Sequence, residues 1–236
     1  MKNILCILAL FTALPCFAQI ETETHAFWQP GAKLTFEMFQ GTPADSAQVK
    51  KVTDVNIFFE IAAGFWSVLD VPASQKDLKR GKMEKPYFCA ALDKGASFWI
   101  VRDSTELKYA QLVWDLVELS TRITRRNLAE FDRKLNEGLR KPAAGGIAMH
   151  FQTAVNDGKE FGREATFAFF GEAVTTRDEE AFRKWRDYVD TQLHALEAYA
   201  TREEEIQRLI SETPEKGYTR ATTLTPDFKG RGTIRY

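Results

Sequence analysis

The 236-residue sequence has few of the residues and motifs by which active sites are recognised. It contains three cysteines and three histidines, and no two of the histidines lie four residues apart. HExxH, CxxC, glycine-rich phosphate-binding and GxSxG motifs are all missing. The sequence therefore carries no direct signature of a zinc protease, a thioredoxin-like protein, a nucleotide-binding protein or an α/β-hydrolase.

Strong net charge and long apolar runs are missing as well. The chain has 32 Lys and Arg against 33 Asp and Glu, a formal net charge of -1, and 44% hydrophobic residues. Disordered chains combine low hydrophobicity with high net charge, and nucleic-acid-binding proteins carry a basic excess. We therefore expect a folded protein with no nucleic-acid partner. We also expect no transmembrane segment, because a span needs about 18 apolar residues.

Residues 1–18 have the pattern of a secretory signal peptide. A basic residue precedes an apolar run that ends at Pro15, and the small residue Ala18 offers a cleavage point. We expect a secreted or periplasmic chain that begins at Gln19. A lipid anchor at Cys16 is a weaker alternative, because Pro15 stands where lipoproteins carry a small residue.

Cleavage would leave Cys89 as the only cysteine of the mature chain. An internal disulfide is then impossible. Because Cys89 lies in an apolar run, we predict that it is a buried, apolar side chain.

Apolar patterning predicts an α+β protein with a β-rich N-terminal half followed by long helices. Residues 52–71, 86–92 and 96–101 are rich in β-branched and aromatic residues, and a hairpin is expected between the last two runs. From Asp103, a potential cap, apolar residues recur at helical spacing and predict a long helix to about Leu139.

The second half is predicted to be less regular. Residues 147–174 follow a glycine-rich break and are expected to be irregular. Thr176 is expected to open a second helix that runs to about Ile210. The polar stretch 212–236 predicts a flexible tail, which leaves a single domain over residues 19–211.

Two segments carry a family resemblance. Trp28 is followed by KLTFEMFQG at 33–41, and residues 98–101 lead into LKYAQLVWDLVE at 107–118. These strings resemble KLTWDDFQG and LKHEQGHFDIAE, which approximate two signatures of the bacterial domain-of-unknown-function 922 family, whose members are predicted secreted zinc-dependent proteases. The resemblance covers most of residues 28–199 and implies a zincin-like fold.

The same resemblance implies that a metal site has been lost. In an HExxH helix, two histidines on one face bind zinc and the glutamate acts as general base. Tyr109, Ala110 and Val113 occupy these three positions here. Tyrosine is a rare zinc ligand, and alanine and valine have no donor atoms. The resemblance therefore implies a pseudoenzyme with no catalytic residue, no metal and no cofactor.

A weaker similarity concerns a YDxETxHG-like motif of the family. Its nearest counterpart is FQTAVNDG at 151–158. On this alignment Gln152, Ala154 and Asp157 replace the acidic and histidine positions. Further metal ligands would then be lost as well.

Three functions remain open. One is a non-catalytic binding or envelope protein, in which Tyr109 and its neighbours fill the former site or line a groove for a peptide, protein or glycan. Another is a hydrolase that uses carboxylates drawn from Asp115, Glu118 and Asp157, about 5 to 9.5 Å apart in an open cleft. The third is an atypical metallopeptidase, for which His150 would be the first ligand to consider.

The remaining polar groups suggest no further site. His194 is predicted to be a surface residue and His150 a loop residue. The basic cluster at 121–126 is interleaved with acidic residues, which predicts a solvated, salt-bridged helix face and no anionic partner.

Overall fold

The computed structural model describes residues 19–221 and confirms the α+β class. The predicted signal peptide and residues 222–236 lie outside this range. The strands are β1 (His25–Phe27), β2 (Phe59–Glu60), β3 (Ala63–Pro72), β4 (Lys85–Asp93), β5 (Phe98–Trp99) and β6 (Tyr218–Arg220). The helices are α1 (Ser46–Thr53), α2 (Gln75–Lys79), α3 (Ser104–Asn136), α4 (Gly146–Phe169), α5 (Glu179–Ala195) and α6 (Glu203–Ser211). Within residues 19–221, no helix is long and apolar enough to cross a membrane.

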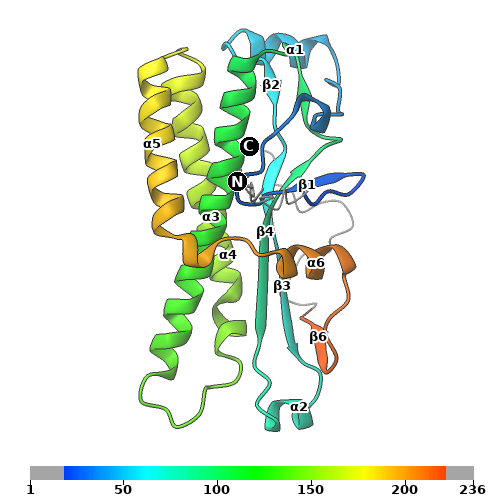
Figure 1. The fold of residues 1–236 in the computed structure, drawn as a ribbon, viewed down its shortest axis with the longest axis vertical. Coiled ribbons are helices and arrows are strands. Elements are labelled where there is room, and N and C mark those ends of the chain that lie inside the picture. Colours follow the sequence, from blue (N-terminus) through cyan, green and yellow to red (C-terminus); the bar gives the residue numbers. More distant parts are fainter. Residues whose placement is uncertain (1–18, 222–236) are drawn as a thin grey trace, which may run out of the picture.

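Four strands form an antiparallel sheet in the order β1-β4-β3-β6 (Figure 1). β3 and β4 pair along most of their length. β1 is much shorter and pairs only with residues 91–93 of β4. The edge of β4 from Lys85 to Cys89 therefore has no other strand of the described chain beside it.

The two faces of the sheet pack against different helices, because side chains alternate along each strand. Phe65 and Phe88 point toward the layer of α3, α4 and α5 and belong to the main hydrophobic core. Val68 and Cys89 point the other way and pack with Leu209. Leu209 belongs to α6, which lies on this side of the sheet (Figure 1). Cys89 is fully buried, as predicted, and burial raises the pKa of its thiol well above the ordinary value.

The long helix α3 begins where the sequence predicts. The carboxylate of Asp103 accepts the backbone N–H groups of Thr105 and Glu106 at 2.8 and 2.9 Å, which caps the helix. The helix ends at Asn136, close to the predicted end at Leu139.

The hairpin predicted between 86–92 and 96–101 is wrong. β4 pairs with β1 and β3, whereas β5 pairs with β2 in a separate two-stranded sheet. At the turn, Asp93 accepts the N–H of Ala96 with its side chain and the hydroxyl of Ser97 with its carbonyl. These bonds turn the chain out of one sheet and into the other.

The region 147–174 is regular, contrary to prediction. It consists of α4 and a π-helical turn, Phe170–Val174. Gly158 lies in the contact with α3, where an added Cβ atom would stand 1.9 Å from the Oγ1 atom of Thr124. Close packing of the two helices therefore requires glycine at this position and outweighs its low helix propensity.

The second predicted helix is two helices, and Thr176 is not its cap. The carboxylate of Asp178 accepts two backbone N–H groups in the first turn of α5. α5 ends at Ala195, and the chain crosses the front of the molecule to α6 on the other face of the sheet (Figure 1). Along this crossing, the backbone and hydroxyl of Thr201 donate to the buried carboxylate of Glu118. A helix running straight on would not make these bonds.

The predicted flexible tail begins with ordered structure. β6 pairs with β3, and the N–H of Ala221 donates to the carbonyl of Leu69 at 2.9 Å. The sheet therefore takes its fourth strand from beyond the predicted domain boundary at residue 211.

Candidate binding site

The three predicted metal-site positions lie in a sealed core. Tyr109, Ala110 and Val113 on α3 are each 0% exposed. The ring of Tyr109 packs edge-on against Phe169 and Phe182, with ring centroids 6.1 and 5.4 Å apart. Because Tyr109 has no exposed surface, it cannot line an open groove for a peptide or glycan.

The residues around Tyr109 do not fit a zinc ion. The Tyr109 hydroxyl has no hydrogen-bond partner, and burial raises its pKa, which opposes formation of a phenolate ligand. The ammonium of Lys108 and the guanidinium of Arg177 lie 5.3 and 5.5 Å from the centre of its ring, which adds positive charge. Nowhere in residues 19–221 do three or more His, Cys, Asp or Glu side chains gather as metal ligands.

A buried ion pair that the sequence did not suggest closes this region. Glu106, 3% exposed, pairs with Arg177 at 2.6 Å. Arg177 also donates to the carbonyl of Asn56, and both residues have left-handed backbone conformations with φ near +60°. These contacts tie the α1–β2 connection to the start of α5. Burial raises the pKa of Glu106 despite the ion pair.

The carboxylates proposed for a hydrolase do not form an open pair. Asp115 accepts hydrogen bonds from Trp28, Gln111 and Arg186 at 2.6 to 3.0 Å. The structure therefore places it in an internal network that joins the N-terminal segment to α3 and α5.

Glu118 and Asp157 are equally unsuited to that role. Glu118 is 0% exposed, and its two oxygens accept bonds from Arg122 and Thr201. Asp157 is exposed on α4. A buried, fully bonded carboxylate and a surface carboxylate cannot flank a substrate in one cleft.

The weak motif at 151–158 lies within α4 and forms no site. Gln152 is exposed like Asp157, and the Gln152 amide donates to Asn156 on the same helix surface. His150 also lies in α4, contrary to the predicted loop, and stacks on Phe131 at 4.2 Å. His194 is 88% exposed in its side chain, as predicted.

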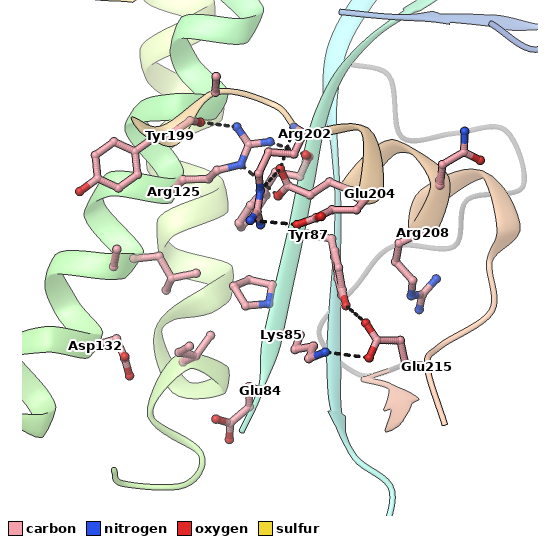
Figure 2. A pocket seen from close by; sticks show the side chains of 18 of the residues that line it. Glu84, Lys85, Tyr87, Arg125, Asp132, Tyr199, Arg202, Glu204, Arg208 and Glu215 are labelled. Atoms are coloured by element: carbon pink, nitrogen blue, oxygen red, sulfur yellow. Dashed lines mark hydrogen bonds and ion pairs between the residues drawn. The ribbon is translucent and has the colours of Figure 1, made fainter. Parts of the chain in front are cut away.

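A cleft of about 980 Å³ lies instead between the helical layer and the free edge of β4. We call it the interlayer cleft. It is lined by α3, the start of α4, the first residues of β4, the crossing segment 198–202, α6 and residues 213–215 (Figure 2). Its apolar wall includes Pro86, Phe88, Leu128 and Ile147. No fixed sequence spacing links these segments, so sequence patterns could not reveal the cleft.

The arginines and the lysine of the cleft are already bound to carboxylates. Lys85 pairs with Glu215 at 2.8 Å, Arg125 with Glu205 at 3.2 Å and Arg202 with Glu204 at 2.9 Å (Figure 2). Arg208 pairs with Asp70 at 2.7 Å. Arg125 also donates to the carbonyls of Phe88 and Tyr199, so it fastens the crossing segment to the edge of β4.

The basic cluster at 121–126 is therefore not a solvated face as a whole. Arg122 is 4% exposed and binds the buried Glu118, and Arg125 lies in the interlayer cleft. Arg126 is the exposed member, with Glu130 at 3.9 Å.

Three titratable groups of the cleft are held in their ordinary charge states. Hydrogen bonding to Glu215 raises the pKa of Lys85, and the same bond lowers the pKa of Glu215. Burial, with the nearby negative charge of Glu215, raises the pKa of Tyr87 to about 12. Each pKa moves away from neutrality, so none of the three groups is poised for proton transfer at neutral pH.

Searches of protein-family models, curated proteins and solved structures gave no match to this chain. The resemblance to the domain-of-unknown-function 922 family therefore stays a prediction from the two sequence strings, and the interlayer cleft stands on its own geometry.

Proposed function

We propose that this chain is an exported, non-catalytic binding protein of the cell envelope or medium that holds a small molecule or a short peptide in the interlayer cleft. Export follows from the predicted signal peptide at 1–18. The proposed loss of protease activity follows from the substitutions at Tyr109, Ala110 and Val113.

Two properties of the cleft carry the proposal: it has room for a ligand, and three of its titratable groups are held in their ordinary charge states. A volume of about 980 Å³ is large enough for a small ligand. Lys85, Tyr87 and Glu215 nevertheless have pKa values displaced away from neutrality. An accessible cavity in which these three groups keep their ordinary charge states is suited to binding more than to proton transfer by them.

A screen against a blocked variant tests the proposal. Ala129 is an exposed residue of α3 that lines the cleft, and Ala129→Trp would fill part of it. Ala195→Trp is the matched control, because Ala195 is exposed at the end of α5 and is not one of the residues that line the cleft. The screen would measure thermal shifts of the full chain with cationic, neutral and anionic small molecules and short peptides.

We expect at least one ligand to stabilise the wild type and the Ala195→Trp variant but not Ala129→Trp. Ligands that bind all three proteins equally would place binding elsewhere and contradict the proposal. The non-catalytic part has its own test. Turnover of a peptide, ester or glycoside that Ala129→Trp abolishes would show an enzyme at this cleft.

A further inference from the structure

The lower end of the interlayer cleft, between α3 and the start of β4, contains two carboxylates without a positively charged partner. Glu84 precedes β4, and Asp132 lies on α3 (Figure 2). Neither forms an ion pair with any described residue, whereas the four basic side chains of the cleft are all paired. The unbalanced charge at this end is therefore negative.

Glu84 is only half satisfied. It is 8% exposed, and its Oε1 atom accepts the backbone N–H of Gly145 at the start of α4. Its Oε2 atom is buried and has no hydrogen-bond partner. A buried carboxylate oxygen without a donor carries a free-energy cost. A donor entering from the cleft would remove this cost once the carboxylate turns toward it.

Asp132 is also free to accept a further bond. One of its oxygens accepts the amide of Asn136 at 2.9 Å, one turn along the same helix. The nearby wall is apolar, because Leu128 and Ile147 line the same cleft. A ligand that suits this surface has a positively charged donor group on an apolar body.

We propose that the interlayer cleft binds an alkylammonium group, carried by a small organic amine or by a lysine side chain of a peptide, between Glu84 and Asp132. This inference rests on the proposed binding function and specifies its ligand class. An anionic ligand would have to displace existing ion pairs. An ammonium group would instead supply the hydrogen-bond donor that Glu84 lacks and the positively charged partner that both carboxylates lack.

Calorimetric titration of the full chain with 1,5-diaminopentane, 1-pentanol and pentanoate tests the charge preference. The variants are Glu84→Gln, which keeps an oxygen for the Gly145 bond, and Asp132→Asn. Glu160→Gln is the control, because Glu160 lies on the exposed face of α4 and its ion-pair partner among the described residues is Arg163. We expect saturable binding of the diamine alone, weakened about tenfold or more by each cleft variant and less than twofold by the control.

The inference would be overturned if pentanoate bound as tightly as the diamine. It would also be overturned if neither Glu84→Gln nor Asp132→Asn weakened binding of the diamine. Failure of all three probes would also overturn it. The binding function itself would survive if the wider screen finds a ligand sensitive to Ala129→Trp. A Gly-Lys-Gly peptide identifies the source: tighter binding than the diamine indicates a lysine side chain, and weaker binding indicates a free amine.

Discussion

The two halves of α3 have opposite environments although they belong to one continuous helix. From Glu106 to Leu119 the helix runs through the core, where Tyr109, Ala110 and Val113 have no exposed surface. From Arg125 to Asp132 the same helix forms a wall of the interlayer cleft. The aromatic residues of α4 and α5 cover the first half, and the short strand β1 leaves the second half beside a free sheet edge.

This difference shows that what lies opposite a helix decides whether its side chains are available. Asp115 and Glu118 are acidic residues in the sealed half, and both are consumed by internal hydrogen bonds. Asp132 is an acidic residue in the cleft half and has no ion pair among the described residues. A charged side chain on a helix is therefore available to bind a ligand only where the neighbouring elements leave room beside it.

The largest effect is expected from introducing an HExxH motif into the sealed half. Tyr109→His, Ala110→Glu and Val113→His together would bury a charge and enlarge a packed helix face, costing about 3 kcal/mol or more and leaving no room for zinc. Thermal unfolding measures the loss of stability, and elemental analysis measures the bound zinc. Gln152→His, Thr153→Glu and Asn156→His place the same motif on the exposed face of α4 as control. A stable variant that binds one zinc ion at 109–113 would show that this half of α3 is not sealed.

The next largest effect concerns the wall of the cleft. Arg208→Met would leave the fully buried Asp70 unpaired and cost about 3–5 kcal/mol. Chemical denaturation measures the change, and Asp70→Asn in the same chain should recover part of it. Arg163→Met removes an exposed pair with Glu160 and should cost at most about 1 kcal/mol. Equal costs would mean that the arginine of the cleft is not structural and is free to bind a ligand.

A smaller effect is expected where α3 meets α4. Gly158→Ala would place a Cβ atom 1.9 Å from the Thr124 hydroxyl oxygen and cost about 1–3 kcal/mol, because two helix backbones would have to separate. Thr124→Ala in the same chain should restore part of the loss. Gly171→Ala is the control, since no atom lies within 4 Å of its added Cβ. Similar Tm values for the two single variants would show that this part of the contact is loose.

The smallest effect is a pH dependence of the sealed half. Burial raises the pKa of Glu106 above its ordinary value of 4.5, so the folded state binds its proton more tightly than the unfolded state. Its contribution to stability is present in full below pH 4.5 and is lost as pH rises through the folded pKa. We expect the Tm of the wild type, relative to Glu106→Gln, to fall over this range.

Glu160→Gln is the matched comparison, because the contribution of Glu160 to stability should change with pH in the opposite direction. Hydrogen bonding to Arg163 lowers the pKa of the exposed Glu160, so its contribution is present above pH 4.5 and is lost as pH falls. If both variants show the same trend with pH, Glu106 is not buried as the structure describes.

Local signals predicted the parts of the fold that depend on nearby residues. The cap at Asp103 and the long helix after it follow from side chains within one or two turns of each other. Cys89 could be predicted as buried because it lies in an apolar run. The hairpin at 93–95 failed, because the partner of each strand lies elsewhere in the chain. The region 147–174 is predicted to be irregular because it follows a glycine-rich break, but it is helical, and its Gly158 is required by a contact with Thr124 of a different helix.

The sequence by itself determined the α+β class, the capped helix that begins after Asp103 and the absence of zinc-binding side chains at 109–113. Only the tertiary structure decided that this helix face is sealed and that the opposite end opens into a cleft. Patterns within a few residues fix local conformation, but access depends on segments far apart in the chain. Here β4, α3 and α6 meet around one space, and Glu84 and Asp132 come to the same end of it although they lie on different elements.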